Sequence, residues 1–208
     1  MGLRKTAATE PLREVVEREN GRDTHGLIAQ LRSGDAEQRR WAARDLAGCG
    51  EAAGVMGERL VADTDPRVRD ALLTSLSATP GEATVNALLP LLRSEDAVLR
   101  NGAIEALAEM PQAVAPRVAT LLRDADADVR IFTVNMMGEL RHGQVVDWLL
   151  QVLDHDAQVN VVAAAIEVLA EVGSPEHEPA LRAAARRFPD DPFIGFAVDM
   201  AAERIRAA

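Results

Sequence analysis

The sequence repeats itself with a period of about thirty residues. In four successive blocks an aspartate is followed four residues later by an arginine and eleven residues later by a large apolar residue. The blocks begin at Asp35, Asp65, Asp96 and Asp126, the arginines are Arg39, Arg69, Arg100 and Arg130, and the apolar residues are Leu46, Leu76, Leu107 and Met137. The aspartates are spaced by 30, 31 and 30 residues, which indicates an array of similar supersecondary units.

Each block has the features of a helix N-terminus. Aspartate is a strong N-cap because its carboxylate accepts a hydrogen bond from an unpaired N–H of the first turn, and the proline of Asp65-Pro66 suits the first helical position. Apolar residues at three, seven and eleven positions after the aspartate predict one buried stripe, which in the second block consists of Val68, Leu72 and Leu76. Because another amphipathic segment precedes each block, as in 85–92 and 114–122, each period is predicted to be a pair of helices.

Two less regular units extend the array. The fifth begins at Asp154 and has Leu169 as its late apolar residue, so its loop is predicted to be two residues longer. Its arginine position falls on Asn160 or Val162, depending on the register, and a sixth unit begins at Asp191. One helix pair cannot bury its own apolar face, whereas stacked neighbours bury it together, and we therefore predict five to six stacked pairs.

The composition agrees with an all-α protein. Apolar residues make up 48% of the 208 residues but aromatic residues only 3%, and a core of Ala, Leu and Val suits closely packed helices better than a β-sandwich. We predict two parts, an N-terminal cap helix over residues 1–23 and a single solenoid over residues 24–208. Residues 191–207 are expected to form a polar cap at the C-terminal end of the array.

The charge balance narrows the class of partner. The chain carries 23 basic and 33 acidic residues, a net charge of -10, which disfavours nucleic acid because phosphate binding depends on Lys and Arg. The first 50 residues are nearly neutral, so the rest of the chain is expected to attract a partner with a basic surface. Residues 1–6 lack the apolar core of a secretory signal, and no stretch has the roughly 20 apolar residues of a membrane span. We expect a cytoplasmic protein that binds no membrane.

The Asp-x-x-Val-Arg blocks, the Ala-rich second helices and the period resemble HEAT repeats of the short, lyase-type subclass over about residues 24–207. The resemblance implies a right-handed α–α superhelix in which the second helix of each pair lines the concave side. It also implies a ladder of side chains that joins adjacent repeats, here Asp35, Arg39, Asp65, Arg69, Asp96, Arg100, Asp126 and Arg130. Members of this family include assembly scaffolds, bilin lyase subunits, a metal-dependent hydroxylase and DNA-repair glycosylases, so the fold alone does not decide the activity.

No residue pattern predicts catalysis, a metal or a cofactor. The acidic loops 63–65, 124–128 and 154–156 lack the glycine and terminal glutamate of an EF-hand, and we expect them to be capping and solvated segments. The single run Glu176-His177-Glu178 does not supply the several His-Glu pairs that a dinuclear site needs. Cys49, the only cysteine, has no histidine near it in the sequence to lower its pKa, so it is expected to be a packing residue or an idle thiol.

The outward side of the second helices remains as the candidate site. Positions five and nine after each aspartate point away from the buried stripe, toward the expected concave face. They are Arg40, Arg44, Asp70, Thr74, Asn101, Glu105, Ile131 and Asn135, with Ala163 and Glu167 in the fifth unit if its loop is extended. Trp41 and Phe132 stand at position six, where other units have small residues, and they either fill gaps in the core or act as partly exposed anchors. Trp148 is expected to pack on the convex side.

These features predict a non-catalytic scaffold or adaptor that binds a partner protein on its concave face by shape and charge complementarity. The site would comprise Arg40, Trp41, Arg44, Asp70, Thr74, Asn101, Glu105, Ile131, Phe132, Asn135 and Glu167. The alternative is a subunit of a bilin lyase or of a similar enzyme complex that handles a cofactor.

Overall fold

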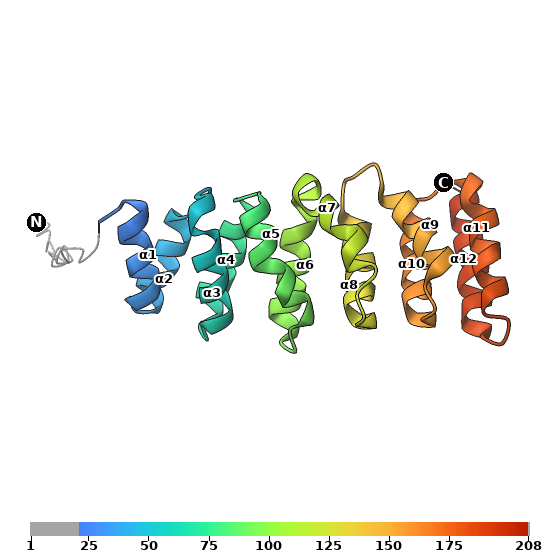
Figure 1. Ribbon diagram of the computed structural model, residues 1–208, viewed down its shortest axis with the longest axis horizontal. Coiled ribbons are helices and arrows are strands. Elements are labelled where there is room, and N and C mark those ends of the chain that lie inside the picture. The colour runs from blue at the N-terminus through green and yellow to red at the C-terminus, as the bar shows by residue number, and fades with distance from the viewer. Residues whose placement is uncertain (1–20, 208) are drawn as a thin grey trace, which may run out of the picture.

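The computed structural model describes residues 21–207 and shows a row of helix pairs (Figure 1). This part of the chain contains twelve α-helices and no strand. The helices are α1 (Thr24–Ser33), α2 (Ala36–Asp45), α3 (Ala53–Ala62), α4 (Pro66–Ser77), α5 (Glu82–Leu88), α6 (Ala97–Ala108), α7 (Pro111–Leu121), α8 (Ala127–Glu139), α9 (Val145–His155), α10 (Val159–Val172), α11 (Glu178–Arg187) and α12 (Pro192–Ala207). Short 3₁₀ segments cover Gly50–Ala52, Leu89–Arg93 and Pro175–His177. Most of the predicted N-terminal cap helix, residues 1–20, lies outside the described residues.

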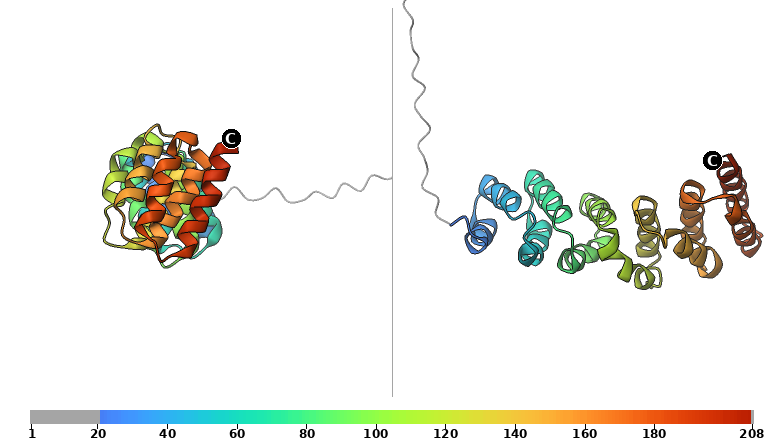
Figure 2. Two further views of the ribbon diagram at one scale, coloured as in Figure 1. Left: turned by 90° about the vertical axis from the view of Figure 1, so that its right-hand side faces the viewer. Right: turned by 90° about the horizontal axis from the view of Figure 1, so that it is seen from above.

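The helices form two layers. The second helices of the pairs pack on one another in the order α2, α4, α6, α8, α10, α12. In the other layer α1, α3, α5 and α7 pack in order and α9 packs on α11, but α7 and α9 make few or no close contacts. Seen from above, the row is bowed, and the layer of second helices lies on its inner side (Figure 2). The prediction of an all-α solenoid is therefore confirmed, with six helix pairs in residues 24–207.

The repeated aspartates begin the second helices as predicted. Asp35 accepts a hydrogen bond from the backbone N–H of Gln38, whose side chain in turn accepts one from the N–H of Asp35. The other three, Asp65, Asp96 and Asp126, each accept a hydrogen bond of 2.9 Å from the N–H two residues later. These bonds satisfy donors that the first helical turn leaves free.

The fifth unit follows the longer register. Its second helix begins after Gln158, which is 32 residues after Asp126, whereas Asp154 lies within α9. The arginine position therefore falls on Val162, which is buried, and Leu169 occupies the expected apolar position. A glutamine replaces the N-cap aspartate here and makes no side-chain capping bond.

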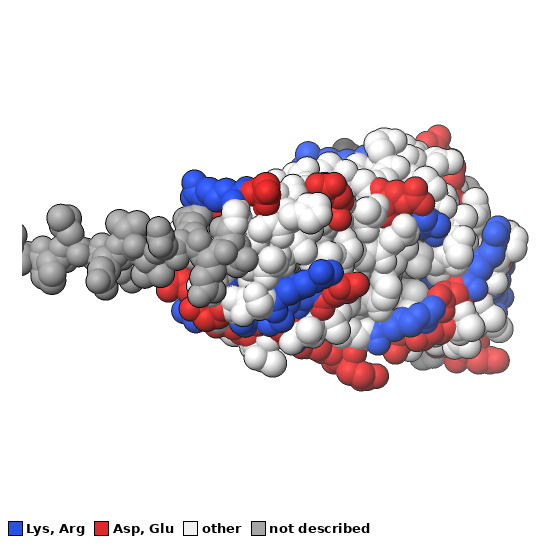
Figure 3. Space-filling model, turned by 60° about the vertical axis from the view of Figure 1, so that its left-hand side comes forward, with Lys and Arg blue, Asp and Glu red and all other residues white. Residues whose placement is uncertain are grey.

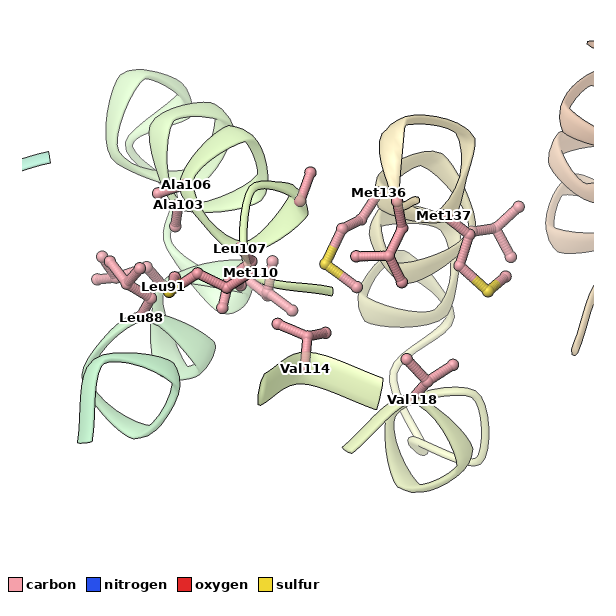
Figure 4. Close-up of a cluster of buried hydrophobic side chains, with 14 of the residues drawn as sticks. Leu88, Leu91, Ala103, Ala106, Leu107, Met110, Val114, Val118, Met136 and Met137 are labelled. Atoms are coloured by element: carbon pink, nitrogen blue, oxygen red, sulfur yellow. The ribbon is translucent and has the colours of Figure 1, made fainter. Parts of the chain in front are cut away.

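The core follows the predicted stripe. Val68, Leu72 and Leu76 are all fully buried in α4. Figure 4 shows the centre of the array, where Met136 of α8 points toward the side of Leu107 and Met137 points away from it. Both methionines are buried because α8 is packed between α6 and α10. Flexible thioether side chains suit such irregular spaces between pairs.

Two first helices are shaped by small or cyclic residues. Pro90 lacks an N–H, and α5 gives way at Leu89 to the 3₁₀ segment that contains this proline. Gly57 of α3 faces Ala87 so closely that a Cβ added to the glycine would lie 2.7 Å from the Cβ of Ala87. A glycine at this position therefore allows α3 and α5 to pack directly.

The last helix corrects one expectation. Residues 191–207 were expected to form a polar cap, but α12 exposes three large apolar side chains, Phe193, Phe196 and Met200. Its opposite side carries Ile194 and Val198, which are fully buried against the preceding helices. The helix is thus apolar on two sides, of which only one is covered within the described residues.

Among residues 21–207, no helix has the length and apolar character needed to cross a membrane.

Candidate functional site

The predicted site residues all lie on second helices, from α2 to α10, on what we call the inner face. Eight of the eleven are exposed, namely Trp41, Arg44, Asp70, Thr74, Asn101, Glu105, Asn135 and Glu167. The other three, Arg40, Ile131 and Phe132, are half-buried. The helices that carry these residues form one continuous layer (Figure 2).

Trp41 and Phe132 occupy the same position of the repeat but differ in their surroundings. Trp41 is 47% exposed, and the guanidinium carbons of Arg40 and Arg44 lie over its ring at 5.5 and 5.8 Å from the ring centre. Phe132 is half-buried against the core, and the guanidinium of Arg100 lies 4.8 Å from its ring centre. Phe132 thus serves partly as core packing, whereas the ring of Trp41 is available at the surface.

A glycine takes this position in α6 because a neighbouring side chain fills the space. A Cβ added to Gly102 would meet Cδ1 of Leu73 at 2.4 Å. Leu73 of α4 therefore replaces the side chain that α2 and α8 supply themselves. A large residue is found at this position where its own side chain fills the space between helices, and a glycine where a side chain of the neighbouring helix fills it.

Charge changes along the inner face. The α2 end carries Arg40 and Arg44, whereas exposed glutamates follow on α6, α8 and α10, at Glu105, Glu109, Glu139, Glu167 and Glu171. Three of these stand at or near helix C-termini, where the helix dipole disfavours a negative charge. Figure 3, which brings the N-terminal end forward, shows acidic and basic side chains interspersed there. The acidic character of the inner face is thus a property of its C-terminal half.

The arginine ladder exists, but its acidic partners differ from those expected. Each ladder arginine donates a hydrogen bond to the loop before its own helix, and the acceptors are the carbonyls of Gly34, Asp63, Ser94 and Asp124. Three of the four also reach a carboxylate of the next repeat, in the pairs Arg39–Asp63, Arg69–Asp96 and Arg130–Asp156. Of the expected N-cap aspartates, only Asp96 accepts from a ladder arginine. In the other two pairs the acid stands two residues before the N-cap.

Asp63 is the central residue of one such contact. Its side chain is fully buried and accepts hydrogen bonds from Arg39 at 2.6 and 3.0 Å, from Arg59 at 2.8 Å and from the backbone N–H of Asp65 at 3.0 Å. Burial alone raises the pKa of this carboxyl, but the bonds from Arg39, Asp65 and Arg59 outweigh it and hold the pKa well below its usual range. The expectation of a solvated loop at 63–65 is wrong for this residue, because its partners replace the water.

Arg100 is the ladder arginine without a carboxylate. The residue two positions before the next N-cap is Asp124, but Arg93 binds it, and the hydrogen bond from Arg93 is the main cause of a lowered pKa at Asp124. Arg100 instead donates to the carbonyl of Ser94 and lies against Phe132, and its Nε is buried without a hydrogen-bond partner. A cation–π contact replaces the ion pair at this step of the ladder.

The remaining residues singled out in the sequence have local partners. Trp148 is buried on α9, in the outer layer as predicted, and stacks on the ring of His142 at 5.2 Å. His177 accepts a hydrogen bond from the backbone N–H of Ser174, and Cys49 is half-buried beside the hydroxyl of Thr24. Within residues 21–207, no three His, Cys, Asp or Glu side chains are grouped so that they could hold a metal ion.

The last two pairs carry a further surface that was not predicted from the sequence. Phe193, Phe196 and Met200 of α12 line an open groove with residues of α10, including Ile166 and Ala170. The signal was present in the repeat, since positions five and nine after Asp191 are Phe196 and Met200. These two residues therefore continue the row of site positions into the sixth unit.

Comparison with known proteins agrees with this architecture. The family model described as HEAT repeats matches residues 24–108 and 114–198. The crystal structure of Cex1p is similar to this chain with 14% identity and a TM-score of 0.52, over 88% of this chain and 42% of Cex1p. A designed armadillo repeat protein in complex with the peptide (KR)4 aligns with 17% identity and a TM-score of 0.42, over 86% of this chain and 98% of its own.

The complex of CpcE and CpcF of phycocyanin lyase from Nostoc sp. PCC7120 aligns with 17% identity and a TM-score of 0.32, over 93% of this chain and 100% of that one. The sequence matches none of the curated proteins with which it was compared. At these identities the likenesses concern the fold alone.

Proposed function

Because this chain belongs to the HEAT-repeat family, we propose that it is a non-catalytic scaffold or adaptor that binds a partner protein on its inner face. The observation that carries the proposal is the exposure of Trp41, in contact with Arg40 and Arg44, at one end of this face. Tryptophan and arginine dominate the energetics of protein interfaces. The packing of the solenoid does not require this ring, because Ala42 and Ala43 beside it supply the buried surface of α2.

The charge of the face supports a partner that presents basic groups toward α6, α8 and α10. Glu109 and Glu139 stand at helix C-termini, where they oppose the helix dipole, and no salt bridge is formed by either residue within the described chain. Such carboxylates gain favourable contacts when a cationic surface approaches. The acidic balance argues against nucleic acid as the partner.

Binding would depend on complementary shape and charge, with no covalent step. The second helices hold these side chains in a continuous packed layer, so little side-chain entropy is lost when a partner binds. The layer is bowed (Figure 2), and a bowed layer can contact more of a convex or extended partner than a flat layer can.

The test is capture of proteins from a native lysate, read by mass spectrometry. Wild type is compared with two inner-face variants, Trp41→Ala/Arg44→Ala and Glu105→Arg/Asn135→Arg, which alter exposed side chains. The matched control is Glu58→Arg/Val61→Ala on α3 of the outer layer, where both residues are also exposed. A protein that is retained by wild type and control but lost from both inner-face variants supports the proposal.

Equal recovery by all four proteins would contradict the proposal. The alternative, a subunit of a bilin-handling enzyme, would then be tested by absorbance titration with a bilin, which shifts the pigment spectrum if the protein binds it.

A further inference from the structure

The groove between α10 and α12 has an apolar floor that water still reaches. Phe196, Phe193 and Met200 are 64%, 56% and 50% exposed, respectively, and all three lie on one stripe of α12. Ile166 and Ala170 of α10 complete the opposite wall. Single exposed apolar residues are common, but a contiguous group of large ones marks an interaction site.

The packing of the solenoid does not account for these three side chains. The last pair is held by Ile194, Val198, Ala201 and Ile205, which lie on the opposite side of α12 and are buried. Substituting the exposed residues would therefore leave this core intact. Their large apolar area favours a role in binding a partner.

The rim of the groove is acidic. Glu167 and Glu171 border it on α10 and Glu203 on α12. Among the described residues that line it, Arg204 is the only basic one, and it lies 3.3 Å from Glu171. Both members of this pair are more than half exposed, so water weakens their attraction and an incoming cation can compete for the glutamate. The groove thus combines an apolar floor with a net negative edge.

We propose that this groove binds the apolar side of a basic amphipathic helix that belongs to a partner protein. Such a helix presents apolar residues at spacings of three and four, which match the spacing of Phe193, Phe196 and Met200 along α12. Its lysines or arginines would lie over Glu167, Glu171 and Glu203. The inference rests on the proposed function and names the chemistry of the partner at one end of the inner face.

A second copy of this chain fits the groove less well. Two grooves placed face to face would bring together Glu167, Glu171 and Glu203 of both copies, and this like-charge contact opposes association. Three aromatic or thioether side chains per copy also cover less than the roughly 800 Å² per partner of a stable interface. A cationic partner avoids both difficulties.

The probe is a fluorescein-labelled leucine–lysine peptide of about 18 residues, long enough to form an amphipathic helix on binding. Binding to the full chain is measured by fluorescence anisotropy. The comparison peptides are a scrambled isomer, which keeps composition and charge but has no apolar side, and a leucine–glutamate version. We expect wild type to bind the leucine–lysine peptide at least about tenfold more tightly than either comparison peptide.

Variants place the binding in the groove. Phe196→Ser/Met200→Ser is expected to lower the affinity for the leucine–lysine peptide at least about tenfold, because the variant lacks two large side chains of the apolar floor. Val61→Ser/Val98→Ser removes two equally exposed apolar side chains elsewhere and is expected to leave the affinity within about twofold of wild type. Glu167→Gln/Glu203→Gln is expected to weaken binding several-fold at low salt and less at high salt. Circular dichroism and the Tm confirm that each variant is folded.

Equal affinity of wild type and Phe196→Ser/Met200→Ser, or equal affinity for the scrambled peptide, would overturn the inference. So would sedimentation that shows a wild-type dimer that this variant abolishes, since a second copy would then occupy the groove. If the peptide does not bind in the groove while capture of a native protein still depends on Trp41 and Glu105, the inference fails and the proposed function stands. If the peptide binds in the groove but capture of a native protein does not depend on Trp41 and Glu105, the proposed function fails and the groove still binds a basic helix.

Discussion

At the scale of single residues, the ladder arginines each contact two repeats. Arg39 donates to the carbonyl of Gly34 in the loop before its own helix and to the carboxylate of Asp63 in the next repeat. Arg130 does the same with Asp124 and Asp156. A planar guanidinium with five donors can form both sets of bonds, which a lysine could not. The arginine thus stabilises the loop geometry and the stacking of neighbours together.

Replacing Asp63 by asparagine is expected to destabilise the protein by about 3 kcal/mol, because the substitution leaves two arginines without their buried counter-charge. Urea unfolding measures the change. Asp65→Asn is the matched control, since Asp65 is half-buried and asparagine is also a good N-cap. An equal loss in both variants would contradict a special role of Asp63.

The pH dependence of this difference has a defined sign. Because the folded-state pKa of Asp63 is lowered, its contribution to stability is fully present above the unfolded pKa of about 4 and is lost as the pH falls toward the folded value. The difference in unfolding free energy between wild type and Asp63→Asn should therefore be constant at neutral pH and shrink below about pH 4. A difference that grows on acidification would show that the carboxylate is not the stabilising form.

Ser94 stands where three other repeats have an aspartate. Its hydroxyl accepts a hydrogen bond from the N–H of Asp96, just as Asp63, Asp124 and Asp156 accept from the N–H two residues later. Ser94→Asp should therefore keep the turn and place a carboxylate near the ladder. We expect a gain of about 1 kcal/mol or less, measured by thermal unfolding, and a smaller gain in high salt. A loss of stability would show that Asp96, which already pairs with Arg69, leaves no favourable contact for a second carboxylate at this step of the ladder.

At the scale of helices, the two glycines of α3 have opposite roles. A Cβ added to Gly57 would lie too close to Ala87, whereas a Cβ added to Gly54 would have no other atom within 4 Å. Gly57→Ala is expected to destabilise the protein by about 1–3 kcal/mol through overpacking. Gly54→Ala in the same helix is expected to stabilise it by up to about 1 kcal/mol, because alanine loses less backbone entropy. Chemical unfolding of the two variants tests the pair, and a stabilising Gly57→Ala would mean that α3 and α5 can separate without cost.

The helices and their buried stripes could be predicted because they depend on local chemistry. An N-cap aspartate and apolar spacing act within one helix, so Asp65 and Leu72 were placed correctly. The partners of the ladder could not be placed, since Arg39 pairs with Asp63 only after two repeats have stacked. Nothing in a sequence such as Asp63-Thr64-Asp65 shows which carboxylate turns inward.

The repeat predicts which positions of the second helices lie in one row, but it does not predict how exposed each side chain of that row is. Position six carries a large ring in both α2 and α8, yet only the ring of Trp41 is free, because Phe132 packs on the core and on Arg100. The apolar row of α12 follows the same numbering, but the ends of a solenoid are normally polar, so its exposure could not be expected from the repeat. That the inner face binds a partner protein remains a proposal, which the lysate experiment tests.

At the scale of the whole molecule, the closely packed helices of residues 21–207 belong to the same pair or to adjacent pairs, and stability is therefore close to a sum of local terms. Leu107→Ala in α6 and Leu181→Ala in α11 both remove a fully buried side chain and should each cost about 3 kcal/mol. Hydrogen exchange should distinguish them. The central change is expected to raise exchange in pairs on both sides, and the change in α11 only in the last two pairs. Uniform acceleration in both variants would indicate that the array unfolds as one unit.

The outer layer is interrupted between α7 and α9, while α8 and α10 remain closely packed on the inner side. In elastic terms, we expect the molecule to behave as a rod with a hinge whose pivot is the α8–α10 contact. Because few or no close contacts join α7 to α9, we expect the described part of the array to bend most readily at this point. The Arg130–Asp156 pair spans the same step of the array, and we expect it to limit that motion. A partner on the inner face that changes the bow of the array would therefore do most of its elastic work here, and the first four pairs would move relative to the last two.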